Sequence, residues 1–308
     1  MGIQLRDETI IRYILLWRMF MTFSIVAYDP DKQEWGVAVA SKFLAAAAVV
    51  SWAQGGVGAV ATQALAKVSF GPDGLSMMAQ GMSAQETLDM MIATDKSGAH
   101  RQVAFVDNKG NVAAHTGPEC LNWAGHKTGK YFSCQGNILT GGNTLDAMAE
   151  AFTSAEGELS DKLLAALLAG DTVGGDSRGK QSAGLLVVKT DGGYGGDNDR
   201  YIDLRVDDDP EPVKKLSKLL GAHHLFFGES NADDLLPITV EIATELQAIL
   251  SKQSYFSGEI SGLWDDASKQ AFWAMVGNEN LEERWNIEDE PDKIDRVALE
   301  YIRGRFKT

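Results

Sequence analysis

A threonine that directly follows a methionine is the most suggestive chemical feature of this sequence. Met21 precedes Thr22 at the start of a β-rich run, so loss of the methionine would give Thr22 a free α-amine. Such an amine has a pKa of ~7.7–8.0 and can accept the proton of the threonine hydroxyl near neutral pH. The junction predicts an N-terminal nucleophile and a natural chain that begins at Thr22. The alternative is an ordinary strand residue, because β-branched side chains favour strands.

Hydroxyl and charged side chains elsewhere could assist such a nucleophile. Ser24 lies on the same face as Thr22, because strand side chains repeat every two residues. Its alternative role is a core hydroxyl held by hydrogen bonds. Ser41 and Lys42 end the next predicted strand, where they offer a hydroxyl and a cation, and Asp176 could orient the α-amine. The candidate catalytic residues are therefore Thr22, Ser24, Ser41, Lys42 and Asp176.

Polar side chains in later strands and turns could bind a substrate. The segment 134–137 ends a predicted strand with Gln135 and Asn137, whose amides could stabilise an oxyanion. The glycine-rich turn 174–184 carries Arg178, which could pair with a substrate carboxylate. An ion pair that only shapes the turn is the alternative. The candidate substrate-binding residues are Gln63, Gln135, Asn137, Arg178 and Ser182.

The sequence contains only two cysteines, Cys120 and Cys134. This sparse usage favours a reducing compartment and two free thiols, although one bridge between them remains open. Cys134 could itself be a nucleophile if His115 or His126 served as its base. We expect a cytoplasmic protein with both thiols reduced.

Other chemistries have little support in the sequence. The acidic runs 197–200 and 207–212 lack metal-ligand spacing, and no glycine pattern marks a nucleotide-binding loop, so we predict no metal and no cofactor. A net charge of −15, from 43 acidic and 28 basic residues, argues against nucleic acid as a partner. The uncharged stretch 43–66 is rich in alanine and glycine, which predicts buried strands around a glycine turn and no membrane partner.

The order of periodic segments predicts a layered α/β sandwich followed by a helical region. Alternating patterns at 22–28 and 35–41 form a hairpin, and later strand pairs alternate with pairs of amphipathic helices. Ser83, with Glu86 three residues on, predicts a helix that begins with a capping box. Such runs suit layers of sheet and helix better than a strict βαβ winding. A polar segment at 231–237 marks a boundary, and residues 238–308 show helical patterns with little strand signal.

The stretch from Thr22 to about Leu220 resembles the family called domain of unknown function 1028. That resemblance implies an N-terminal-nucleophile hydrolase fold, which is a four-layer αββα sandwich. Related hydrolases such as proteasome β-subunits place a lysine on an early strand beside the nucleophile, and this chain has no lysine at 43–66. The segments that carry the resemblance are 22–27, 36–43, 56–64, 123–126, 134–137, 174–185 and 197–208.

The segment 244–277 resembles the small helical peptidoglycan-binding module. The matching features are Leu246-Gln247, Tyr255-Phe256, the glycine-flanked segment 258–262 and Ala271-Phe272. The expected organisation is a leader at 1–21 that is absent from the natural protein, a hydrolase-like domain at 22–230 and an all-α domain at 237–308.

These features together predict an amidohydrolase that acts on an amide or peptide-like small substrate. We expect the groups around Thr22 and those around Asp176 to line one cleft, because buried polar groups must find partners or a ligand. The alternative is a catalytically silent protein of the same fold that binds a small molecule or a cell-wall fragment. The sequence leaves open whether the chain forms a homo-oligomer.

Overall fold

The computed structural model describes residues 22–306 except 229 and 231, so the predicted leader at 1–21 lies outside the described residues. The chain divides into two compact units that meet between Leu219 and Leu220. This division falls inside helix α7 (Pro212–Phe227), before the polar segment 231–237. Each unit has its own hydrophobic core.

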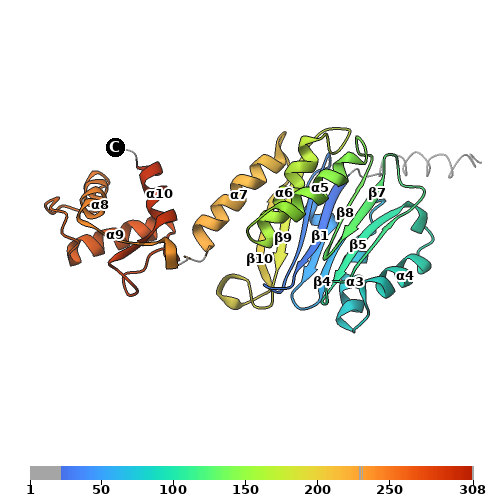
Figure 1. The fold of residues 1–308 in the computed structure, drawn as a ribbon, viewed down its shortest axis with the longest axis horizontal. Coiled ribbons are helices and arrows are strands. Elements are labelled where there is room, and N and C mark those ends of the chain that lie inside the picture. Colours follow the sequence, from blue (N-terminus) through green and yellow to red (C-terminus); the bar gives the residue numbers. More distant parts are fainter. Residues whose placement is uncertain (1–21, 229, 231, 307–308) are drawn as a thin grey trace, which may run out of the picture. The chain divides into compact units, whose positions relative to one another are not determined.

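The first unit is built around a six-stranded antiparallel sheet, sheet A, with the order β10-β9-β2-β1-β8-β7. The hairpin of β1 and β2 lies at its centre, as the sequence predicted (Figure 1). Every residue of β2 is buried, because other layers cover both faces of the sheet. The strands are β1 (Thr22–Asp29), β2 (Glu34–Ser41), β7 (Gly125–Gly129), β8 (Phe132–Asn137), β9 (Ser182–Val188) and β10 (Arg200–Val206).

A four-stranded antiparallel sheet, sheet B, packs against sheet A and has the order β3-β4-β5-β6. Two of its strands lie within the uncharged stretch 43–66 and are joined through Gly55 and Gly56, so the prediction of strands around a glycine turn is confirmed. No helix in the described part of the chain is long and apolar enough to cross a membrane. The elements are α2 (Ala47–Val50), β3 (Ser51–Gln54), β4 (Gly58–Ala64), β5 (Arg101–Asp107) and β6 (Val112–Thr116).

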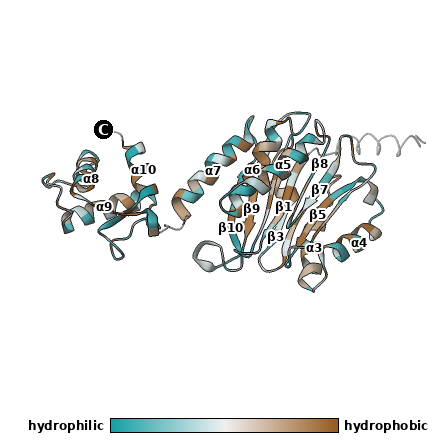
Figure 2. Cartoon of the chain, viewed as in Figure 1, coloured by the Kyte–Doolittle hydropathy of each residue, from teal (hydrophilic) through white to brown (hydrophobic). Residues whose placement is uncertain are grey.

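Helices cover the outer faces of the two sheets, which gives the order helix, sheet, sheet, helix (Figure 1). The predicted layered α/β sandwich of antiparallel sheets and helices is confirmed. Hydrophobic residues dominate interior strands such as β1 and β5, whereas the covering helices are mixed (Figure 2). The helices α3 (Phe70–Ala79) and α4 (Ala84–Thr94) cover sheet B, and α5 (Asn143–Ser154) and α6 (Leu159–Thr172) cover sheet A. Two short turns of 3₁₀ helix are η1 (Gly98–His100) and η2 (Tyr194–Gly196).

The start of α4 is fixed by the capping box that the sequence predicted. The backbone N–H of Glu86 donates to Ser83 Oγ at 3.3 Å, and the backbone N–H of Ser83 donates to Glu86 Oε2 at 2.9 Å. These two bonds satisfy donors that the first turn of a helix otherwise leaves without partners. The backbone N–H and the hydroxyl of Ser83 both donate to the Glu86 carboxylate, and these bonds hold the pKa of Glu86 below its ordinary value.

The sequence predicted an all-α second unit. This unit is mostly helical, but it also contains a short β-sheet. Its core includes Leu246, Phe272 and Ile302. A short two-stranded sheet joins segments about 60 residues apart, and local periodicity carries no sign of such a pairing. The elements are η3 (Ala232–Asp234), β11 (Leu235–Pro237), α8 (Val240–Lys252), α9 (Asp266–Glu279), β12 (Lys293–Asp295) and α10 (Arg296–Arg305).

A buried ion pair organises the second unit. The Arg284 guanidinium lies 3.2 Å from the Asp295 carboxylate and also donates to the backbone carbonyl of Leu225 at 2.9 Å. Asp295 in turn accepts from the backbone N–H of Val297 at 2.7 Å and so caps α10. Both charges are buried, so each needs the other, because a lone buried charge is costly.

Candidate active site

Thr22 is the first residue of β1, the strand that lies between β2 and β8 in sheet A. Its side chain is 1% exposed, and its Oγ1 lies 3.2 Å from the Oγ of Ser41. On the other side, Thr22 is paired with Asn137. The backbone N–H of Tyr28 donates to Tyr131 at 2.9 Å, and hydrogen-bonded pairs alternate along antiparallel strands. Thr22 lies an even number of residues before Tyr28, so Thr22 and Asn137 also form a hydrogen-bonded pair, in which the Thr22 nitrogen points toward the Asn137 carbonyl.

A buried hydrogen-bond network follows Thr22 into the space between the sheets. Ser24 Oγ donates to Gln63 Oε1 at 2.7 Å and accepts from Gln135 Nε2 at 2.7 Å. Gln63 Nε2 also contacts the Thr22 carbonyl at 3.4 Å, and Ser133 Oγ donates to Gln135 Oε1 at 2.9 Å. These side chains are at most 1% exposed. The network therefore ties β1 and β8 of sheet A to β4 of sheet B at the Thr22 end.

Gln102 on β5 is the centre of this network, although the sequence analysis did not select it. Its Oε1 accepts from Gln63 Nε2 at 2.8 Å and from Asn137 Nδ2 at 2.9 Å. Its Nε2 donates to the Gly136 carbonyl at 2.8 Å and to the Gly125 carbonyl at 3.0 Å. The sequence does contain a sign of this role, since Gln102 lies in the otherwise apolar run of β5. A polar group buried in a sheet requires hydrogen-bond partners.

The network leaves few amide hydrogens for a substrate. Gln63 uses both of its amide hydrogens within it, one to Gln102 and one to the Thr22 carbonyl. Gln135 donates one amide hydrogen to Ser24, and Asn137 donates one to Gln102, so each retains a second hydrogen. Of these two expected oxyanion donors, Asn137 is the strand partner of Thr22.

The segment 174–179, which we call the strap, holds Asp176 against the end of β2. Asp176 Oδ2 accepts from the backbone N–H of Lys42 at 2.7 Å. Its Oδ1 accepts from the backbone N–H of Arg178 at 3.0 Å, and the Arg178 guanidinium lies 3.2 Å from Oδ2. Asp176 is 5% exposed, so these donors replace water around its carboxylate.

The strap crosses the amino end of β1. On the β8 side, the backbone N–H of Ser177 donates to the Ile138 carbonyl at 3.3 Å, and that of Thr140 donates to Gly175 at 3.1 Å. On the β2 side, the strap is bound to Lys42. Because β1 lies between β2 and β8, a segment attached to both must pass over the start of β1. Gly175 packs against the ring of Phe23, whose side chain leaves β1 on the face opposite to that of Thr22, so the strap also contacts the helix-covered face of sheet A.

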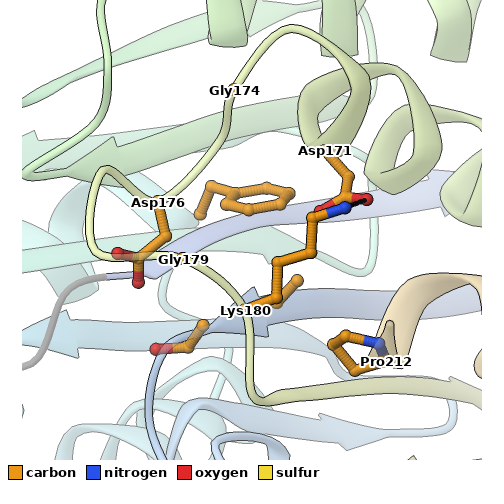
Figure 3. Close-up of a pocket in the computed structure, with 9 residues that line it drawn as sticks. Asp171, Gly174, Asp176, Gly179, Lys180 and Pro212 are labelled. Atoms are coloured by element: carbon orange, nitrogen blue, oxygen red, sulfur yellow. Dashed lines mark hydrogen bonds and ion pairs between the residues drawn. The ribbon is translucent and has the colours of Figure 1, made fainter. Parts of the chain in front are cut away.

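A small recess lies under the strap (Figure 3). Its volume of about 10 Å³ has room for about one water molecule. Lys180 Nζ donates to Asp171 at 2.6 Å and to Glu211 at 3.2 Å. Burial acts to lower the pKa of Lys180, but the bonds from the two carboxylates outweigh it and raise the pKa. The lining residues are Phe23, Ala40, Ser41, Asp171, Gly174, Asp176, Gly179, Lys180 and Pro212.

Residues 22–216 match the model of a family of unknown function, DUF1028. The chain belongs to this family. Residues 226–302 match a putative peptidoglycan binding domain. The DUF1028 domain is similar to a crystal structure of protein SPO2555 from Silicibacter pomeroyi, itself a DUF1028 protein, at 30% identity and a TM-score of 0.62. That match covers 68% of this chain and 88% of the other. A search of curated proteins found no match.

The DUF1028 domain gathers most of the predicted site residues at one end of its sheets, but their roles differ. Thr22, Ser41 and Asn137 lie together there, and Asp176 reaches the same strand end through Lys42. The Lys42 ammonium donates to the Lys180 carbonyl at 3.2 Å, so its observed contact is with the residue that follows the strap. Thr22 is buried and does not line an open cleft.

Ser182 was predicted to bind substrate, and in the DUF1028 domain it supports the turn after β2. Its Oγ donates to the Phe43 carbonyl at 2.6 Å and accepts from the backbone N–H of Ala46 at 3.0 Å. Both bonds satisfy the hydroxyl inside the protein. Ser182 therefore fixes the turn that follows Ser41 and Lys42.

Three of the non-glycine residues with positive φ in the DUF1028 domain lie at the same end of the sheets, whereas Gln33, Tyr131 and Asp191 lie in turns elsewhere. Ala45, Ala64 and Ile138 have φ values of 52°, 62° and 51°. They follow the ends of β2, β4 and β8, close to Ser41, Gln63 and Asn137. A positive φ is unfavourable for residues with a Cβ atom and especially for β-branched isoleucine. Such strain can persist at functional sites, but the residues with positive φ at the opposite strand ends mean that it does not single out this end.

The cysteines of the DUF1028 domain are both free thiols. Cys134 is wholly buried, and burial raises the pKa of its thiol. Its neighbour Gln135 faces the network between the sheets, so Cys134 faces the opposite side. His126 Nδ1 lies 2.9 Å from the hydroxyl of Thr116, and burial lowers the pKa of this histidine. The geometry therefore does not favour Cys134 as a nucleophile.

In the described part of the chain, no three histidine, cysteine, aspartate or glutamate side chains are grouped to hold a metal ion.

Proposed function

We propose that the DUF1028 domain is an N-terminal-nucleophile amidohydrolase whose nucleophile is Thr22. The fold would then be the αββα sandwich of that hydrolase class, and the substrate a small amide or peptide-like molecule. The proposal requires a chain that begins at Thr22, because only a free α-amine can act as the base. The observation that carries it is the position of Thr22, at the start of a central strand with its Oγ1 3.2 Å from Ser41 Oγ.

The proposed reaction uses the α-amine of Thr22 for every proton transfer. The amine takes the hydroxyl proton while Oγ1 bonds to the substrate carbonyl carbon, and the second amide hydrogen of Asn137 stabilises the oxyanion. The C–N bond then breaks, and the ammonium returns its proton to the leaving amine. Water attacks the resulting Thr22 ester with the same amine as base, which releases the acid and restores the hydroxyl.

The surroundings of Thr22 support this assignment of the base. The side chains that contact its network are neutral, namely Ser24, Gln63 and Ser41. The Lys42 ammonium is directed to the Lys180 carbonyl. With no histidine or lysine in these contacts, an amine on Thr22 itself is the base that the arrangement favours.

The test uses a chain that begins at Thr22, released by a protease from an N-terminal fusion. A small β-lactone serves as the probe, because Oγ1 opens its ring to form an ester that retains the whole probe mass. We expect a stoichiometric adduct on Thr22 by intact-mass measurement and peptide mapping. The labelling rate should rise with pH through about 8, as the α-amine loses its proton.

Three matched proteins control this experiment. Thr22→Ser should keep the adduct, because it retains both hydroxyl and amine, whereas Thr22→Val should lose it. The chain that retains residues 1–21 should also stay unlabelled, because its Thr22 nitrogen is an amide. Equal labelling with and without residues 1–21, or no adduct on the chain that begins at Thr22, would rule out the free-amine mechanism.

A second candidate function rests on the match of residues 226–302 to a putative peptidoglycan binding domain. In this alternative the chain binds a cell-wall fragment through its second unit, and the DUF1028 domain is catalytically silent. Calorimetric titration with soluble muropeptides tests it. Binding by the full chain, together with no lactone adduct on Thr22, would favour this alternative over the hydrolase.

A further inference from the structure

The candidate nucleophile is closed off from substrate in the structure. Thr22 is 1% exposed and Ser41 is 2% exposed. The recess beside Ser41 and Asp176 has a volume of only about 10 Å³, whereas pockets for small molecules usually measure ~300–1,000 Å³. A substrate can therefore reach the Thr22 hydroxyl only if part of the surrounding structure moves.

The strap is the segment best suited to move. The strands on either side of Thr22 are held by continuous ladders with their neighbours. The strap instead begins and ends at Gly174 and Gly179, whose φ values are 119° and 110°. Glycine tolerates such angles, so rotation at these two positions can swing the segment between them. Residues 177–179 are exposed, so their movement displaces no core packing.

Asp176 is the side chain that fastens the strap. It is the buried side chain of the segment, and its carboxylate accepts the backbone N–H of Lys42 at 2.7 Å. Bonds to a charged acceptor are stronger than those between neutral groups. The strap's two backbone bonds to the β8 side are longer, at 3.1 and 3.3 Å. The Asp176–Lys42 bond therefore contributes most to the closed position.

We propose that the strap is a lid over Thr22 and that Asp176 is its latch. In the closed state Asp176 joins the strap to the end of β2 and covers the start of β1. Rupture of its bond to Lys42 lets the strap rotate about Gly174 and Gly179 and exposes Thr22 and Ser41. The inference rests on the proposed function only for the identity of the reacting group, because lid motion can be measured without hydrolysis.

The experiment places a thiol under the lid of the full chain by Thr22→Cys. Iodoacetamide is the probe: the thiolate sulfur bonds to its CH₂ carbon, the C–I bond breaks and iodide leaves. Peptide mapping gives the alkylation rate at position 22 with Asp176 intact and after Asp176→Ala. We expect this rate to rise about tenfold to a hundredfold in the Asp176→Ala background, the effect of losing a bond to a charged group.

The same chain supplies the controls. Cys134 is wholly buried, so its alkylation reports global unfolding and should stay negligible in both backgrounds. Ser177→Ala changes an exposed strap side chain and should leave the rate at position 22 unchanged. Asp176→Asn keeps an oxygen that can accept from Lys42 but loses the charge, so its rate should lie between those of the parent and Asp176→Ala.

Two results would overturn the lid. One is an equal rate at position 22 with and without Asp176, and the other is a rise there that Cys134 matches, since that means unfolding and not local opening. Failure of the hydrolase proposal looks different. In that case the lactone adduct is absent from Thr22 while alkylation through Thr22→Cys still depends on Asp176.

Discussion

The two ends of the β1–β2 hairpin differ sharply in the chemistry they contain. At one end Thr22 and Ser41 adjoin a neutral network of amides and hydroxyls whose hydrogen bonds span the two sheets. At the other end the rings of Tyr28 and Trp35 stack at 4.9 Å within sheet A, and Trp35 Nε1 donates to the Asp107 carbonyl of sheet B at 3.1 Å. There the opposite face of β2 carries Glu34, a buried acid.

Glu34 is poorly compensated. It is 3% exposed, and its Oε2 has no hydrogen-bond partner. Burial raises the pKa of Glu34 to about 7, and the Lys189 ammonium 3.9 Å away lowers it only in part. Glu158 and Asp29 add to the increase through like-charge repulsion. The ion pair with Lys189 is therefore too long to offset the cost of burying the charge.

This contrast shows that a perturbed pKa and a reactive group need not coincide. A search for perturbed acids would select the Glu34 end, because such groups often mark functional sites. The hydroxyl pair and the strap instead lie at the Thr22 end. Structural ion pairs also perturb pKa values, and we assign the Glu34 cluster to that class.

The largest expected effect on the free energy of unfolding comes from a substitution that breaks the network at the Thr22 end. Gln102→Leu removes the centre of the network and leaves the Asn137 amide and the Gly136 carbonyl without this partner. Because each orphaned buried group costs about 1–3 kcal/mol, we expect the free energy of unfolding to fall by about 3–5 kcal/mol. Urea titration followed by circular dichroism measures this change.

An exposed glutamine provides the control for that substitution. Gln85 on α4 donates only to Asp89 at the surface, so Gln85→Leu should change the unfolding free energy by less than about 0.5 kcal/mol. Similar small effects for both substitutions would mean that the network does not hold the two sheets together.

The opposite end should respond to pH in a way that the Thr22 end does not. The pKa of Glu34 is about 7 in the folded chain, against an ordinary value of 4.5, so its stabilising contribution is present below about pH 4.5 and is lost as pH rises through 7. Glu34→Gln mimics the protonated acid. We expect it to raise the free energy of unfolding by about 1–3 kcal/mol at pH 8 and hardly at all at pH 4.

Urea titrations at both pH values measure this difference. Glu156→Gln serves as the matched control, because Glu156 is exposed on the same domain and should show no pH-dependent gain. A gain that is the same at both pH values would mean that Glu34 does not change its protonation on unfolding.

The contrast between the ends was only partly accessible from the sequence. Local patterns predicted the hairpin, the strands within 43–66 and the capping box at Ser83, because each depends on neighbouring residues. The pairing of Thr22 with Ser41 also followed from the hairpin. The sequence also predicted that Asp176 of the strap lies near Thr22, but not the path of the strap across the start of β1. Gln102 and β7 were not predicted, because they meet the neighbours of Thr22 only after pairings that are distant along the chain.

Ile138 gives the smallest predicted effect, and it concerns backbone strain at the Thr22 end. Its φ of 51° is unfavourable for any residue with a Cβ atom, by roughly 1–2 kcal/mol. Ile138→Gly and Ile138→Ala both remove the side chain, but only glycine relieves the strain. We expect the glycine variant to be more stable than the alanine variant by about 1 kcal/mol in urea titration.

At Thr128, an exposed residue of β7, the order should reverse, because alanine is favoured over glycine in ordinary strands by roughly 0.5–1 kcal/mol. If alanine equals or exceeds glycine at position 138, the end of β8 beside Thr22 is not held in the strained conformation.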